Sequence, residues 1–149
     1  MNNLEDILRN IVNQISVEIE KINAGGCGWF CLFLSKKLEE LKIDYDLVII
    51  NSDSFRNIYL VSKLKDSDYS DNLAARHYML KVGKYYIDGN NLCKSLPNTY
   101  KYDSYMIIPT NYKTIQKICY SGEWNPTFKI RNLKYIKKII RNNFKNYGL

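Results

Sequence analysis

The chain has a single histidine, His77, among its 149 residues, and its four cysteines form no CxxC pair. A structural zinc site needs about four Cys or His ligands at close spacing, and disulfide-stapled domains are much richer in cysteine. We therefore expect no metal site and no cofactor. We also expect reduced thiols, as in a cytoplasm, or in a virion and its host cytoplasm if a phage encodes the chain.

Long apolar runs are also missing from the sequence. No run of about 20 apolar residues is present, so no membrane span is expected. Residues 1–21 are amphipathic rather than continuously apolar, which predicts a helix over residues 3–21 and no secretory signal. A length of 149 residues fits a single domain, which we expect to cover residues 1–149.

Acidic residues are scarce at the C-terminal end. Residues 111–149 contain nine Lys or Arg and one acid, Glu123, whereas residues 1–110 carry a net charge of −1. Helical spacing over residues 133–144 predicts a final helix with an apolar stripe and a basic stripe, the latter made by Arg131, Lys134, Lys138, Arg141 and Lys145. The basic stripe is either the solvated face of a packed helix or a docking surface for nucleic acid or an acidic protein.

Hydrophobic periodicity predicts the other elements. It indicates helices over residues 28–41 and 111–120, strands over 45–50, 76–82, 85–88 and 105–108, and an ambiguous segment over 55–64 where a helix is favoured. The first half of the 28–41 helix is apolar on all sides, which is typical of a buried helix. We therefore expect an α+β fold in which this central helix packs on an antiparallel sheet.

Cys27 stands at the start of the central helix, in the sequence GGCGWFC. A cysteine attacks as its thiolate, which a helix N-terminus stabilises through unpaired backbone N–H groups and the helix dipole. Gly25 and Gly26 leave room for a substrate, and Gly28 leaves the following N–H open to an oxyanion. This pattern predicts a nucleophilic Cys27 with an oxyanion site near Cys27 and Gly28.

The predicted hairpin around Gly83-Lys84 determines whether the imidazole of His77 lies near the carboxylate of Asp88. Glycine at the first central position favours a two-residue turn, which would pair Val82 with Tyr85. His77 and Asp88 would then lie diagonally on one face, on which Asn90 also lies, close enough for the carboxylate to orient the imidazole. The order Cys27, His77, Asp88 is that of a thiol-nucleophile enzyme.

Each of these residues has a structural interpretation too. A cysteine entering an apolar helix is often a packed thiol, a strand histidine is often structural, and an aspartate before glycine is common in turns. Cys31 lies one turn after Cys27, inside the apolar stretch, where burial would raise the pKa of its thiol. The three residues in this order favour an active thiol at Cys27.

The segments GGCGWFCLFLSKKL and HYMLKVGKYYIDGN together resemble the papain-like superfamily, particularly its transglutaminase-like and cell-wall amidase branches, and are similar to small phage proteins of this type. The resemblance implies a papain-like fold with Cys27 as nucleophile, His77 as general base and acid, and Asp88 as the orienting residue. Papain-like peptidases also carry an oxyanion-hole glutamine shortly before the cysteine, and residues 21–26 contain none. Asn23, or backbone N–H groups alone, would take that role.

We expect Gly25, Gly26, Trp29 and Asn90, which flank the three residues, to contact substrate. The predicted activity is attack of Cys27 on an amide, isopeptide or ester bond of a peptide or protein, followed by transfer of the acyl group to water or to an amine. The alternative is a non-catalytic interaction or virion protein with the same fold, which docks through the basic stripe.

Overall fold

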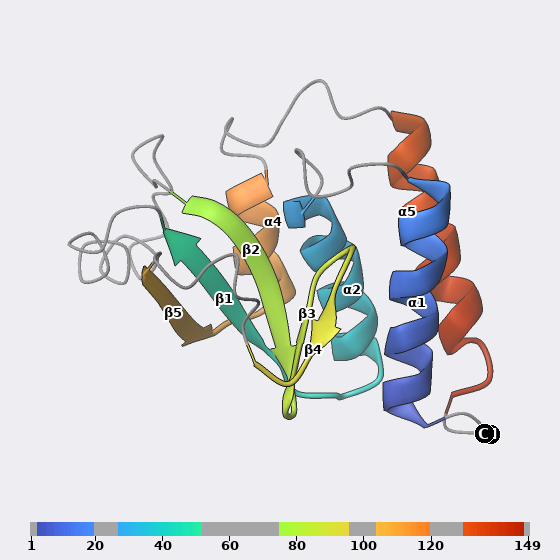
Figure 1. Cartoon of the computed structure of the whole chain (residues 1–149), viewed down its shortest axis with the longest axis horizontal. Coiled ribbons are helices and arrows are strands. Elements are labelled where there is room, and N and C mark those ends of the chain that lie inside the picture. The colour runs from blue at the N-terminus through green and yellow to red at the C-terminus, as the bar shows by residue number, and fades with distance from the viewer. Residues whose placement is uncertain (1–2, 20–26, 52–74, 96–103, 120–129, 148–149) are drawn as a thin grey trace.

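The computed structural model describes residues 3–19, 27–51, 75–95, 104–119 and 130–147. These residues form helices and one antiparallel sheet with the strand order β4-β3-β2-β1-β5 (Figure 1). The predicted α+β class is thereby confirmed. The helices are α1 (Leu4–Glu18), α2 (Cys27–Glu40), α4 (Tyr112–Cys119) and α5 (Ile130–Phe144), and the strands are β1 (Asp46–Asn51), β2 (Ala75–Val82), β3 (Tyr85–Ile87), β4 (Leu92–Cys93) and β5 (Ser104–Pro109).

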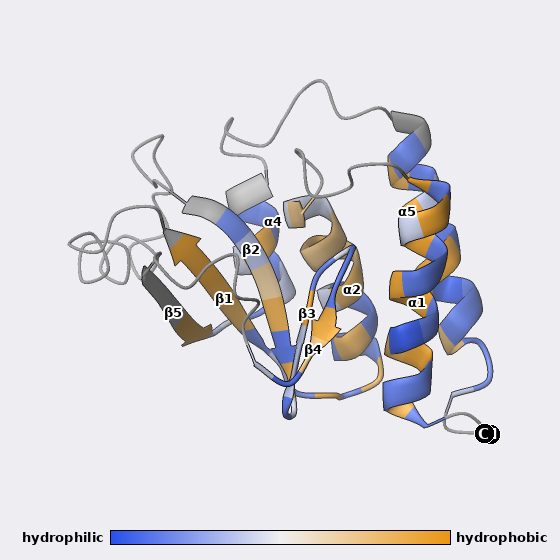
Figure 2. Cartoon of the chain, in the orientation of Figure 1, coloured by the Kyte–Doolittle hydropathy of each residue, from blue (hydrophilic) through white to orange (hydrophobic). Residues whose placement is uncertain are grey.

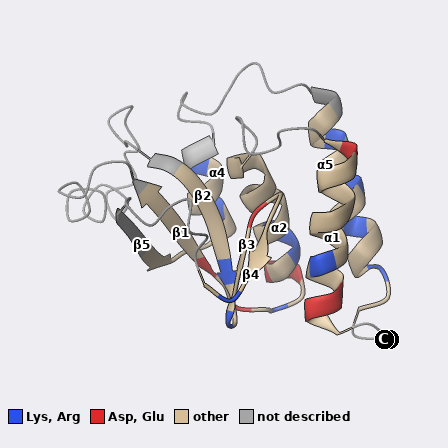
Figure 3. Ribbon diagram, in the orientation of Figure 1, with Lys and Arg blue, Asp and Glu red and all other residues tan. Residues whose placement is uncertain are grey.

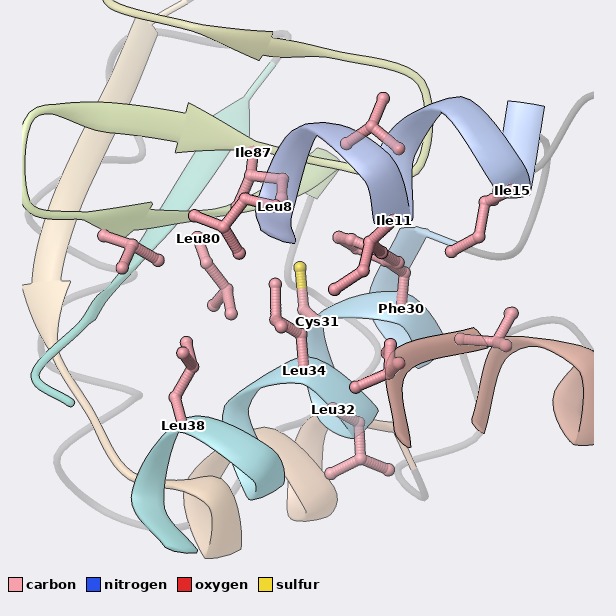
Figure 4. Packing of buried hydrophobic residues seen from close by; sticks show 14 of the residues in the cluster. Leu8, Ile11, Ile15, Phe30, Cys31, Leu32, Leu34, Leu38, Leu80 and Ile87 are labelled. Atoms are coloured by element: carbon pink, nitrogen blue, oxygen red, sulfur yellow. The ribbon is translucent and has the colours of Figure 1, made fainter. Parts of the chain in front are cut away.

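Helix α2 lies between the sheet and the side-by-side pair α1 and α5 (Figure 1). It is buried on most of its circumference, as its apolar first half predicts, with Phe30, Cys31 and Leu34 fully covered. The apolar side of α1 faces this core through Ile7, Leu8, Ile11, Val12 and Ile15, which recur at helical spacing (Figures 2 and 4). The main core is therefore the layer between α2, the helix pair and one face of the sheet.

Strand β2 separates two apolar clusters. Tyr78, Leu80 and Val82 belong to the main core with the helices, whereas Met79 packs with Val48 and Ile50 in a second, smaller cluster. Successive strand residues point to opposite faces of a sheet, so this division follows directly from the sequence alternation. The residues of β2 thus contribute to both faces of the sheet.

The hairpin turn is also as predicted, but the ladder is shorter. Val82 pairs with Tyr85 and Leu80 with Ile87, across a two-residue turn at Gly83-Lys84. The expected extension of the second strand to Asp88 is wrong, because β3 ends at Ile87 and the chain then turns back into β4, a strand that periodicity missed. The short β4 carries too few residues for an alternating pattern to be visible in the sequence.

Gly83 adopts a φ of +60°, in the left-handed region, and a Cβ added to it would meet nothing within 4 Å. We therefore expect Gly83→Ala to destabilise the fold by about 1 kcal/mol through backbone strain alone. Urea denaturation would measure this loss. Lys84→Ala, at the neighbouring turn position, is the matched control and should change stability by less than about 0.5 kcal/mol; equal losses in the two variants would contradict a strain specific to Gly83.

Several expectations lie outside the described residues: the helix over residues 55–64, and the positions of Asn23, Gly25 and Gly26. Among the helices that the structure describes, none has the length and hydropathy needed to cross a bilayer.

Candidate active site

Cys27 is the first residue of α2, and its side chain is half-buried. The apolar stretch that follows Cys27 packs into the core. The thiol therefore stands where the first-turn N–H groups of a helix point and where the positive end of the helix dipole lies.

His77 is in β2 and is only 3% exposed. On one side its backbone position is paired with Ile50 of β1. On the other side the β2–β3 ladder stops at the Leu80–Ile87 pair, so within the described ranges no strand pairs with His77 there. The early end of β3 thus opens the sheet edge next to the imidazole, and the turn that follows β3 brings Asp88 to it.

Asp88 is fully buried and occupies the first position of a tight turn over residues 88–91. The backbone N–H groups of Asn90 and Asn91 each donate to Asp88 Oδ1 at 2.8 Å, and the Asn91 side-chain amide also donates to the carboxylate. The other oxygen, Oδ2, lies 2.7 Å from His77 Nε2. The carboxylate is therefore held by the turn in one orientation, with Oδ2 directed at the imidazole.

The imidazole of His77 links the acid to the thiol. Nε2 is engaged with Asp88, and a hydrogen bond with the Cys27 side chain also contributes to the raised pKa of His77. The ring therefore interacts with both the Asp88 carboxylate and the Cys27 side chain. The structure brings Cys27, His77 and Asp88 together from α2, β2 and the turn after β3.

The surroundings of His77 favour its protonated form. Burial alone would lower the pKa of His77, but the hydrogen bond to Asp88 and that to Cys27, with the charges of both groups, raise it to about 9. Burial would likewise raise the pKa of Asp88, but the hydrogen bond from His77 and those from the turn hold it below its usual value. An ionised Asp88 therefore faces a His77 that keeps its proton at neutral pH.

Such an arrangement can generate and use a thiolate. An imidazolium beside a cysteine stabilises the negative sulfur, and the same proton is then available to a leaving group. The orienting carboxylate keeps the ring from rotating and fixes which nitrogen faces the sulfur. Among the described residues, no group of three or more Cys, His, Asp or Glu is arranged to hold a metal ion.

Three other residues with a predicted role, Trp29, Asn90 and Gly28, lie within the described part of the chain. Trp29 is half-buried, packs on the main core and has its ring centroid 6.2 Å from that of Phe33. The Asn90 side chain is exposed, and its amide oxygen accepts from Ser16 of α1 at 3.4 Å. Gly28 is buried within the first turn of α2. Trp29 and Asn90 are thus at least partly exposed, and a direct substrate contact stays a prediction for each.

Sequence reasoning missed Asn91, which supplies a backbone and a side-chain donor to Asp88. It also missed Ser16, whose hydroxyl donates to the carbonyl of Gly89 at 3.4 Å and so joins α1 to the turn. The run Asp-Gly-Asn-Asn was a usable signal, because Asp side chains commonly accept the N–H groups of residues two and three further on. The contact from Ser16 had no local signal.

The other cysteines and the basic helix carry none of the predicted catalytic roles. Cys31 is fully buried, as predicted, and burial together with the charge of Asp88 raises the pKa of the half-buried Cys93 thiol.

On α5, Ile136, Ile140 and Phe144 are buried. The basic stripe is exposed at Lys134, Lys138, Arg141 and Lys145, while the side chain of Arg131 is outside the described part. Cys119 likewise belongs to α4 without a described side chain.

Comparisons with protein-family models, with curated proteins and with solved structures found no match to this chain.

Proposed function

We propose that the chain is a cysteine-nucleophile hydrolase or acyltransferase of papain-like fold, acting on an amide, isopeptide or ester bond through Cys27, His77 and Asp88. One observation carries this proposal: a buried imidazole is hydrogen-bonded to Asp88 at 2.7 Å and also to the thiol at the tip of α2. A merely packed cysteine requires neither an imidazole partner nor a carboxylate behind it. The packing of α2 on an antiparallel sheet supports the papain-like assignment.

The first half of the reaction forms a thioester. The Cys27 thiolate attacks the carbonyl carbon, and the C=O π electrons move to the oxygen, which accepts from the Cys27 backbone N–H. As the tetrahedral intermediate collapses, the bond to the leaving amine or alcohol breaks. The imidazolium of His77 donates a proton to that leaving group. Asp88 stays ionised throughout and holds the ring in place.

The second half releases the acyl group. The acceptor is a water molecule or an amine, and its oxygen or nitrogen attacks the thioester carbonyl. Neutral His77 takes a proton from the acceptor during this attack. The C–S bond then breaks and returns the electron pair to sulfur, which restores the thiolate–imidazolium pair. Hydrolysis and acyl transfer therefore share every enzyme group and differ only in the acceptor.

The experiment that tests the proposal is site-resolved alkylation with iodoacetamide at pH 7. Cys93 is the internal control, because it is half-buried like Cys27 but has its pKa raised. We expect peptide mass mapping to show Cys27 modified at least about tenfold faster than Cys93, since an ordinary thiol is only a few per cent ionised at this pH. Equal rates at the two cysteines would contradict an activated thiol.

A second candidate function rests on the exposed cations of α5. A non-catalytic protein would use Lys134, Lys138 and Lys145 to dock on nucleic acid or an acidic partner. Slow alkylation of Cys27 combined with salt-sensitive binding through these residues would favour this function over the enzyme.

A further inference from the structure

A groove of about 340 Å³ lies between α2, α4 and α5, on the part of α2 remote from Cys27. Its lining includes Phe33 and Lys36 of α2, Tyr112 of α4, and Lys137 and Arg141 of α5. Lys36 is nine residues beyond Cys27, about 13 Å along the helix. None of the three proposed active-site residues lines this groove, so it is a separate feature of the surface.

The groove carries a strong excess of positive charge. Of its described lining residues, four are cationic, Lys36, Lys37, Lys137 and Arg141, and one, Glu40, is acidic. Glu40 is already 3.0 Å from Lys37 in an ion pair. Figure 3 shows Lys and Arg on α2 and α5, the two helices that supply these four cations. Three cations of the lining are thus left to face a ligand, which must be anionic.

The aromatic rings of the groove hold two of these cations in place. The ammonium of Lys137 lies 4.9 Å from the Phe33 ring centroid, and that of Lys36 lies 5.8 Å from the Tyr112 ring centroid. Cation–π contacts at such distances position the ammonium groups over the ring faces. Nucleic-acid bases need open ring faces on which to stack, so these rings are poorly suited to bind single-stranded nucleic acid.

The nearby helix end is not available to a phosphate either. Helix N-termini bind phosphates through their free first-turn N–H groups. In α4, the N–H of Tyr112 donates to the Glu39 carboxylate, and that of Thr114 donates to the Asn111 side chain at 2.9 Å. Both donors already have a protein acceptor, which leaves the side-chain cations as the charged groups that a ligand would meet.

The base of the groove is apolar. Leu32 and Ile140 line it and are themselves 4% and 2% exposed. A ligand that matches the groove therefore combines dispersed negative charges with an apolar group between them. Its volume is at the lower end of the range of about 300–1,000 Å³ for ligand pockets, enough for a few side chains.

We propose that this groove binds a short acidic peptide segment of a partner protein, with carboxylates at Lys36, Lys137 and Arg141 and an apolar side chain over Ile140. The site is independent of the proposed catalysis, because it uses no residue of the Cys27 site. If the chain acts on proteins, the groove would hold an acidic stretch of the substrate away from the bond attacked.

The test is fluorescence anisotropy with a labelled peptide of alternating glutamate and leucine at about 50 mM salt, where surface charges are weakly screened. We expect the double variant Lys36→Glu/Lys137→Glu to weaken binding about tenfold, since two attractive contacts become repulsive. The matched control is Lys134→Glu/Lys138→Glu, which makes the same charge change on exposed residues outside the groove lining. The control should lose less than about threefold.

Two other ligands test whether the groove selects acidic peptides, and two other variants test whether binding is independent of Cys27 and of misfolding. A lysine–leucine peptide should not bind, and labelled oligothymidylate should bind more weakly than the acidic peptide. Cys27→Ser should bind as the unaltered chain does, which separates failure of the groove from failure of the catalytic proposal. The neutral pair Lys36→Gln/Lys137→Gln, checked by circular dichroism, replaces the glutamate pair if that variant does not fold. Absent binding of the acidic peptide, equal losses in groove and control variants, or preference for oligothymidylate would each overturn the proposal.

Discussion

Replacing His77 by alanine is expected to slow alkylation of Cys27 by iodoacetamide at pH 7 by about thirtyfold. The proposed activation depends on a protonated imidazole beside the sulfur, and the hydrogen bond between these two groups is part of what raises the pKa of His77 to about 9. Without that partner, the sulfur loses the positive charge that is proposed to stabilise its thiolate, and alkylation slows because the thiolate is the reactive form. The readout is the rate of modification at Cys27 by mass spectrometry.

The control for this variant is Cys93 of the same chain, whose thiol donates to the backbone carbonyl of Tyr86 at 3.9 Å. Its modification rate should change by less than about twofold if His77→Ala leaves the fold intact. A Cys27 rate that is the same with and without the imidazole would remove the basis of the catalytic proposal. A rise in the rates of Cys27 and Cys93 together would instead report unfolding, and His77→Gln would then be measured in its place.

Replacing Asp88 by alanine is expected to cost about 3 kcal/mol of folding free energy. The carboxylate is fully buried and accepts from His77, from the N–H groups of Asn90 and Asn91, and from the Asn91 amide. Its removal leaves a charged imidazole and two backbone donors without their acceptor. Urea denaturation at pH 6 would measure the loss, and Asp44→Ala, at an exposed aspartate, should stay within about 0.5 kcal/mol.

The cost of Asp88→Ala should depend on pH in a defined direction. The pKa of His77 is raised from 6.5 to about 9, so its stabilising contribution is complete below pH 6.5 and is lost as the pH rises through 9. The pKa of Asp88 is lowered from 3.8, so its contribution is present above that pH and is lost on acidification. The difference between wild type and variant is therefore largest between about pH 4 and 6.5 and shrinks on either side. A difference that stays constant from pH 6 to above pH 9 would contradict the pairing.

Local sequence rules accounted for much of the candidate site. Gly83 at the first turn position favoured a two-residue hairpin, which pairs Leu80 with Ile87 and returns the chain toward β2, and the sequence pattern predicted a helix start at Cys27, where α2 begins. Both are short-range effects of glycine geometry and of helix ends, which leave a recognisable pattern in neighbouring residues. The bonds of Asn91 to Asp88 also follow from a short-range rule, although the prediction did not use it.

Other features depend on contacts between distant segments. Ser16 reaches Gly89 across 73 positions of the chain, and Lys137 lies over the ring of Phe33. No periodicity or turn rule relates such pairs, because their proximity comes from how α1 and α5 pack on α2. The basic stripe of α5 was visible in the sequence, but the groove between α2, α4 and α5, to which the stripe contributes only Arg141, was not.

The amino-acid pattern alone was therefore enough to define an α+β chain, its main helices, the hairpin turn and the positions of a thiol, an imidazole and a carboxylate, because turns, helix starts and alternation are properties of adjacent residues. The packing of α2 against β2 decided that the imidazole meets the thiol, and the early end of β3 decided how the carboxylate reaches the imidazole. The packing of α2, α4 and α5 also decided where the cationic groove forms. These outcomes belong to the tertiary structure because they arise from burial of apolar surfaces between segments far apart in the chain.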